Sequence, residues 1–172
     1  MARAVADPDN PSWRLGLLVG QRLGLSLGPE ARNRLTRDPF DPELWQLALA
    51  GLDAESATKT LELAVSLLDL PHACRGAAAG IRFGPELLAQ FTLEGILQAL
   101  RRLPGSGTQL VQFALRAPRT RTRLEALDLL FDWPGLAVPN ALRNAVEQCL
   151  RDPDERVRTC AEELLKSWHA AD

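Results

Sequence analysis

Hydrophobic residues along most of this chain recur at intervals of three and four, which places them on one face of an α-helix. The segment 55–70 is typical, because a single face carries Leu61, Ala64, Val65 and Leu68. The runs in which hydrophobic and polar residues alternate are not joined by hairpin turns. The pattern therefore predicts an all-α fold.

Prolines, glycines and capping residues mark where these helices begin and end. Asn10-Pro11 combines a capping side chain with a proline in the first turn, and Gly28-Pro29 is a helix stop. These signals predict a first helix over residues 11–27, and Asp41-Pro42 predicts the start of another. The remaining expected helices lie near residues 29–37, 55–70, 72–82, 86–103, 107–117, 119–132, 138–151 and 154–169.

Glycines recur every four residues in the first predicted helix, at Gly16, Gly20, Gly24 and Gly28. The leucines between them also alternate as in a strand, but the capping residues favour a helix. On a helix the glycines form a stripe without side chains, at a cost of roughly 1 kcal/mol each relative to alanine. The stripe predicts close packing against a neighbouring helix or, as the alternative, a homodimer contact through Gly16, Gly20 and Gly24.

The C-terminal third repeats itself at a spacing of 35 residues. Two segments, 106–133 and 138–168, each hold two helical patterns separated by a turn. A unit of this length and content is typical of stacked helix pairs. The matching positions are Val111 and Val146, Pro118 and Pro153, Arg121 and Arg156, Arg123 and Arg158, Ala126 and Ala161, Leu129 and Leu164, Leu130 and Leu165, and Trp133 and Trp168.

The second unit resembles the second half of a HEAT repeat, in which an Asp-Pro turn is followed by Val-Arg, then Ala, then a pair of leucines. In this chain the corresponding residues are Asp152-Pro153, Val157-Arg158, Ala161 and Leu164-Leu165. The resemblance implies a right-handed α-solenoid of about four to five antiparallel helix pairs, with a concave binding surface formed by the inner helices. It implies no particular activity, because HEAT-type folds serve mainly as adaptors.

HEAT repeats also carry a polar ladder that links successive units. The resemblance implies that Asp152 and Arg158 belong to such a ladder. The preceding unit departs from the pattern, because Ala117 replaces the aspartate while Arg123 retains the arginine.

The composition is that of one ordinary globular domain of 172 residues, with 46% hydrophobic residues and a net charge of −2. It excludes a disordered chain and gives no general attraction to nucleic acid. We expect a flexible N-terminus over residues 1–10 and a single domain over 11–172. No segment reaches the roughly 18 apolar residues of a membrane span, and the N-terminus lacks the apolar core of a signal peptide. An odd set of cysteines without a CxxC pair favours reduced thiols in a cytoplasmic protein: Cys74, Cys149 and Cys160.

Catalytic and metal-binding motifs are absent from the sequence. His72 and His169 stand apart, and the Gly105-Ser106-Gly107 run lacks the lysine and the preceding strand of a phosphate-binding loop. We therefore predict no catalytic residue, no cofactor and no metal site, and a protein that is not an enzyme.

Six arginines and no acid occur within residues 101–123, whereas residues 124–172 hold five basic and ten acidic side chains. Arg119, Arg121 and Arg123 crowd a predicted helix start, where the helix dipole disfavours cations. A negative group should offset them. It is either the acidic turn of the next unit, with Asp152, Asp154 and Glu155, or an anionic partner such as nucleic-acid phosphate. The candidate partner-binding residues from this segment are Arg116, Arg119, Arg121 and Arg123.

The four tryptophans divide into two pairs. Trp133 and Trp168 end equivalent helices, so we expect each to fill the gap between layers. Trp13 and Trp45 lie in the first turns of their helices and are either core residues or exposed anchors for a partner.

These observations favour a non-enzymatic scaffold or adaptor that binds a protein partner through a solenoid surface. One alternative is a HEAT-like protein that binds nucleic acid, including one that acts on DNA bases, which the arginine-rich segment favours. The other alternative is a structural capping domain of a larger assembly.

Overall fold

The computed structural model describes residues 12–25, 27–76, 83–133 and 138–170. All regular structure in these ranges is helical, so the predicted all-α class is confirmed. None of the helices in these ranges is both long and apolar enough to cross a lipid bilayer. The expected flexible segment 1–10 lies outside the described residues. The helices are α2 (Trp13–Arg22), α3 (Gly28–Arg34), α4 (Pro42–Leu49), α5 (Ala54–Leu67), α6 (Leu70–Ala73), α7 (Pro85–Leu100), α8 (Thr108–Leu115), α9 (Thr120–Phe131), α10 (Asn140–Cys149) and α11 (Glu155–His169).

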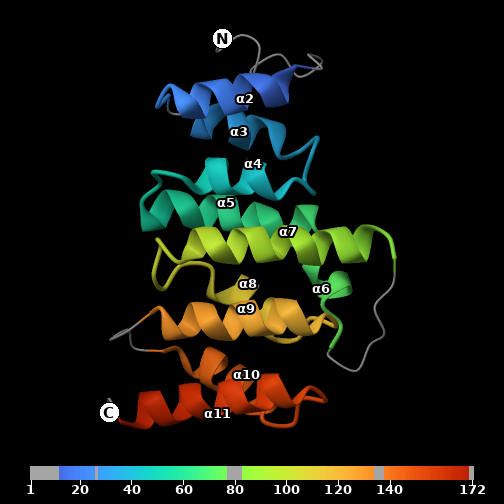
Figure 1. Cartoon of the computed structure of the whole chain (residues 1–172), viewed down its shortest axis with the longest axis vertical. Helices are drawn as coiled ribbons and strands as arrows, with labels where there is room; N and C mark the ends of the chain where they lie inside the picture. The colour runs from blue at the N-terminus through green and yellow to red at the C-terminus, as the bar shows by residue number, and fades with distance from the viewer. Residues whose placement is uncertain (1–11, 26, 77–82, 134–137, 171–172) are drawn as a thin grey trace.

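The helices are stacked along the long axis of the molecule, with α2 at one end and α11 at the other (Figure 1). A chain of direct contacts runs from α3 to α4, from α4 to α7, from α7 to α9 and from α9 to α11. Helix α7 is central, because it also contacts α6 and α8. Most of its residues from Ala89 to Leu97 are buried, including the polar side chains of Gln90, Thr92 and Glu94.

Aspartates fix the starts of three helices by accepting hydrogen bonds from backbone N–H groups that lack a partner within the helix. Asp41 Oδ1 accepts from the N–H of Glu43 at 3.0 Å before α4. The equivalent bond from Ser56 N to Asp53 Oδ1 at α5 is 2.8 Å. Asp154 caps α11 in the same way.

The first helix is shorter than the sequence pattern predicts. It ends at Arg22, and Gly24 follows with a left-handed backbone, φ +68°. Gly28 and Pro29 begin α3 instead of ending the first helix, because proline suits the first turn of a helix. The four glycines therefore do not form one stripe. Gly20 packs within the chain, since a Cβ there would lie 2.8 Å from Leu27 Cδ1. The homodimer contact through Gly16, Gly20 and Gly24 stays a prediction.

The helix expected over 72–82 is also reduced. Helix α6 holds only four residues, Leu70–Ala73, and Pro71 lies in its first turn. Gly76 follows with φ +128°, a conformation that residues with a side chain rarely adopt. Residues 77–82 lie outside the described part of the chain.

The two C-terminal helix pairs have matching positions and contacts. Helices α9 and α11 begin 35 residues apart, at Thr120 and Glu155. Helix α8 packs on α10, and α9 packs on α11, so each helix lies against its counterpart. The counterparts that are buried in both pairs include Val111 and Val146, Ala126 and Ala161, Leu129 and Leu164, and Leu130 and Leu165.

Helix α7 approaches the start of α4 closely at Gly95. A Cβ on Gly95 would lie 2.6 Å from Pro42 Cβ, and the proline ring cannot rotate away. We expect Gly95→Ala to lower the free energy of unfolding, because overpacking costs about 1 to 3 kcal/mol, more than the roughly 1 kcal/mol that alanine gains in helix propensity. Denaturant unfolding measures the change, and a variant more stable than the parent would contradict this contact.

Candidate functional site

The arginine-rich segment is largely neutralised by acids on neighbouring helices. Arg101 pairs with Asp132 and approaches Glu125, with its Nη2 at 3.8 Å from Glu125 Oε2. Arg119, Arg121 and Arg123 also have acidic partners, which come from both sides of α9. Four of the six arginines are therefore ion-paired.

Arg123 forms a buried ion pair with Asp152 of the next helix pair. The side chains are only 1% and 3% exposed. Arg123 Nε and Nη2 lie 2.7 Å and 2.8 Å from the two carboxylate oxygens of Asp152. Nη1 donates to the carbonyls of Ala117 at 2.7 Å and Pro118 at 2.8 Å. The guanidinium therefore joins α9 to the turn before α11, as the acidic-turn interpretation predicts for this one arginine.

The other two arginines turn to the preceding helix instead. Arg119 Nη1 is hydrogen-bonded to Glu94 Oε1 on α7, and Thr122 Oγ1 donates to the same oxygen at 2.7 Å. Arg121 Nε lies 3.8 Å from Glu94 Oε2. Glu94 is only 8% exposed, so one buried carboxylate offsets both cations at the start of α9. The predicted partners Asp154 and Glu155 do not form ion pairs with Arg119 or Arg121. Asp154 pairs with Arg156 instead, and the hydrogen bond from Arg156 lowers the pKa of Asp154 to about 2.

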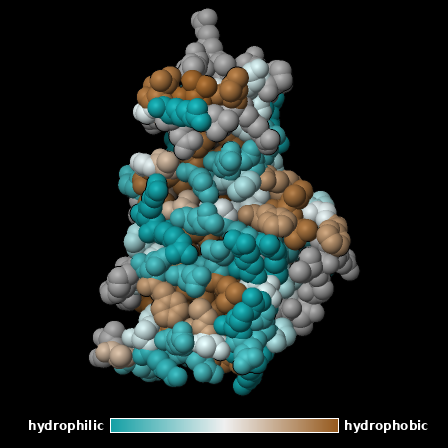
Figure 2. Space-filling model, viewed as in Figure 1, coloured by the Kyte–Doolittle hydropathy of each residue, from teal (hydrophilic) through white to brown (hydrophobic). Residues whose placement is uncertain are grey.

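An exposed apolar patch lies beside these arginines, where α7 begins. Figure 2 shows hydrophobic side chains gathered on this side of the molecule. Phe83 is 94% exposed, Leu88 is 49% exposed and Phe91 is 43% exposed. The guanidinium of Arg119 lies over the Phe91 ring, 4.2 Å from its centroid. We call these three apolar residues the α7 patch; their sequence pattern does not distinguish them from core positions.

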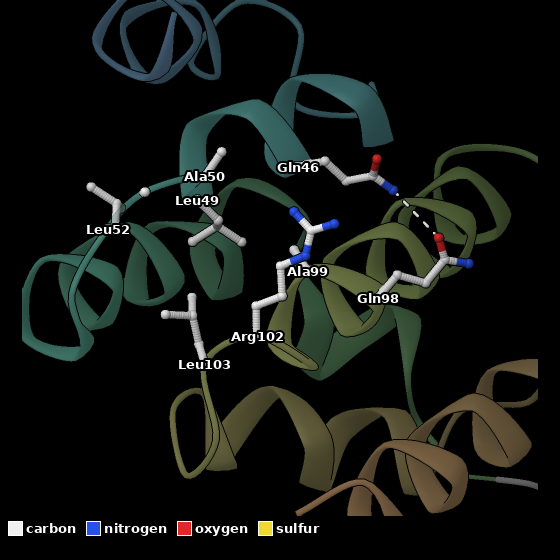
Figure 3. Close-up of a pocket in the computed structure, with 9 residues that line it drawn as sticks. Gln46, Leu49, Ala50, Leu52, Gln98, Ala99, Arg102 and Leu103 are labelled. Carbon is white, nitrogen blue, oxygen red and sulfur yellow. Dashed lines mark hydrogen bonds between the residues drawn. The ribbon is translucent and has the colours of Figure 1, made fainter. Parts of the chain in front are cut away.

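Arg102 and Arg116 differ from the other four arginines. Both are exposed, and neither forms an ion pair or a hydrogen bond with a side chain in the described part of the chain. Arg116 follows α8 at the surface. Arg102 follows α7 and lines a pocket at the end opposite to the α7 patch (Figure 3).

The two tryptophans considered as exposed anchors are buried. Trp45 is fully buried in the core, and its Nε1 donates to the carbonyl of Pro39 at 2.7 Å. Trp13 is 7% exposed, with the Arg34 guanidinium over its ring at 4.0 Å. Neither indole presents a surface for a partner, because both rings are buried.

No group of three or more metal-ligating side chains occurs among the described residues. Burial raises the pKa of the Cys74 and Cys149 thiols to about 12 and that of Cys160 to about 11. These thiols are protonated near neutral pH and are poor nucleophiles. His72 instead contacts Glu86, with Nε2 at 2.8 Å from Oε1.

Comparison of the chain with protein-family models, with curated proteins and with solved structures finds no match. Its function is therefore inferred from its own contacts and surfaces.

Proposed function

We propose that the chain is a HEAT-like α-solenoid and serves as a non-enzymatic protein-interaction module. The contacts of the two matching arginines support the solenoid. Arg158 Nη1 donates to the carbonyls of Asp152 at 2.8 Å and Pro153 at 3.2 Å. Arg123 makes the same two bonds 35 residues earlier, to Ala117 and Pro118. A recurring side-chain contact of this kind is expected of structural repeats in which each unit binds the next.

The link between units is the Arg123 to Asp152 ion pair. Asp152 Oδ1 also accepts a hydrogen bond from the N–H of Asp154 at 2.9 Å. The same carboxylate therefore stabilises the turn and binds Arg123 of the preceding unit. Ala117, which takes the place of an aspartate in the earlier unit, cannot form the equivalent link. The buried glutamate of α7 supplies the negative charge there, through Arg119 and Thr122.

The α7 patch carries the proposal for protein binding. Leu88 and Phe91 are three residues apart on one face of α7, and Phe83 lies just before the helix. Exposed apolar patches mark protein-interaction sites, and arginine is enriched in interaction hot spots. Arg121, with a 66% exposed side chain and only long contacts of 3.6 Å and 3.8 Å to acids, has donors available for a partner. We infer a protein partner that presents an apolar side chain flanked by a carboxylate.

The pairing of the arginine segment weakens the nucleic-acid alternative. A phosphate-binding surface needs arginines whose charge is not already neutralised, and four of the six in this segment face acids. A salt-dependent mobility shift with duplex DNA would favour that alternative over the present proposal.

The test compares two exposed apolar surfaces of the same protein. Partners are captured from the native host, purified and titrated against the parent chain, the double variant Leu88→Ala with Phe91→Ala, and the control Phe131→Ala. Phe131 is 38% exposed and lies on α9, outside the α7 patch. We expect the double variant to weaken binding by about 30-fold or more, the effect of losing a hot spot.

The control should bind like the parent, and circular dichroism should show all three proteins folded. A purified partner that binds the double variant as tightly as the parent would refute the role of the α7 patch.

A further inference from the structure

A pocket of about 370 Å³ lies between the C-terminal ends of α4 and α7, at the opposite end of α7 from the apolar patch (Figure 3). Its volume is within the range of small-molecule sites. No acidic residue is among the nine that line it: Gln46, Leu49, Ala50, Gly51, Leu52, Gln98, Ala99, Arg102 and Leu103.

The guanidinium of Arg102 is the charged group of this pocket. It extends from the end of α7 to lie among the other lining side chains (Figure 3). Two nearby helix-end carbonyls already accept hydrogen bonds, Ala48 O from Arg32 Nη1 at 3.0 Å and Leu49 O from Leu52 N at 3.3 Å. The Arg102 side chain forms no hydrogen bond or ion pair with the described residues, so its donors are available to a ligand.

The two sides of the pocket have opposite character. In Figure 3 the Gln46 and Gln98 amides lie on one side of Arg102, joined by a hydrogen bond of 3.4 Å from Nε2 to Oε1. Leucine side chains lie on the other side. The Arg102 guanidinium therefore lies between a polar side and an apolar side of the pocket.

We propose that this pocket binds an aliphatic carboxylate. The two carboxylate oxygens of the ligand would accept two parallel hydrogen bonds from the Arg102 guanidinium. Such bidentate, charge-assisted pairs are among the strong hydrogen bonds of proteins. Its hydrocarbon part would cover Leu49, Leu52 and Leu103. The same chemistry is offered by a free short-chain carboxylate and by the C-terminal carboxylate of a peptide that ends in leucine. The site is separate from the α7 patch, so either proposal can fail without the other.

Titration with hexanoate, followed by NMR of the protein, tests the proposal. Hexanoate should shift signals of the pocket residues, whereas neutral hexanamide and acetate, which lacks the apolar part, should bind at least about tenfold more weakly. Arg102→Gln should weaken hexanoate binding at least about tenfold. The matched control is Arg116→Gln, which removes the other unpaired exposed arginine of the segment and should leave binding unchanged.

A second variant tests the location without touching the charge. Ala50 is exposed at the pocket and has an ordinary backbone conformation, φ −62°, so Ala50→Trp should fill the cavity and abolish binding in a folded protein. A peptide ending in leucine, compared with its amidated form, distinguishes the two sources of carboxylate. Absence of binding by both hexanoate and the peptide, or binding that survives Arg102→Gln or Ala50→Trp, would overturn the proposal.

Discussion

Replacing Arg123 with glutamine should destabilise the protein by about 3 to 5 kcal/mol, the usual cost of breaking a buried ion pair from one side. Asp152 would keep its charge at a position where its side chain is 3% exposed. The shorter glutamine would also leave the carbonyls of Ala117 and Pro118 without their donor. Denaturant unfolding should show the loss as a lower midpoint.

The control for this experiment is Arg121→Gln, two residues away on the same helix. Its side chain is 66% exposed and its contacts to Glu94 and Glu125 are long. Solvent-exposed pairs of this kind contribute about 0 to 1 kcal/mol, so the midpoint should hardly move. Equal midpoints for Arg123→Gln and the parent would mean that the joint between the last two helix pairs does not depend on this ion pair. The two variants thus separate an arginine that holds the fold from one that is available to a partner.

The C-terminal half could be predicted from sequence because the same pattern occurs there twice. The assignment of helices in one unit supports the assignment in the other. The Asp-Pro turn marks a helix start, and the spaced leucines mark the buried face. The helix limits expected for 107–117, 119–132, 138–151 and 154–169 therefore agree with α8 to α11 within a few residues.

The helix limits of the N-terminal part are harder to predict from sequence, because glycine has several roles there. Gly24 ends a helix through its left-handed backbone, and Gly20 permits close packing against Leu27. Gly28 lies at the start of α3. An even spacing cannot distinguish these roles, because each depends on the conformation of the backbone and on what packs nearby.

The sequence alone does not predict the partner of Arg119, for a different reason. Glu94 is a lone acid within the apolar run Leu93 to Leu97, and a charge in such a run has to be paired if it is buried. The position of Glu94 in this run is the sequence signal that indicates a buried, paired carboxylate. The arginines that pair with Glu94 lie 25 and 27 residues later in the chain. Only the packing of α9 on α7 brings these arginines close to the glutamate. Exposure of the α7 patch also depends on packing, since its residues fit the helical spacing of a buried face.

A charge placed in the seam between α9 and α11 should prevent folding. Ala161 and Leu164 are fully buried on α11, and α11 packs on α9. Ala161→Arg would force a guanidinium into this close-packed contact, so we expect no cooperative thermal transition.

The milder variant Leu164→Ala should remain folded and lose about 2 to 5 kcal/mol, because it leaves a cavity. Glu162→Ala is the matched control, since Glu162 is exposed on the same helix and its loss should leave the melting temperature nearly unchanged. If Leu164→Ala melts like the control, the face of α11 that joins the two helix pairs is not the one that carries Ala161 and Leu164. The repeat register would then be wrong, because it depends on α9 and α11 presenting equivalent residues to each other.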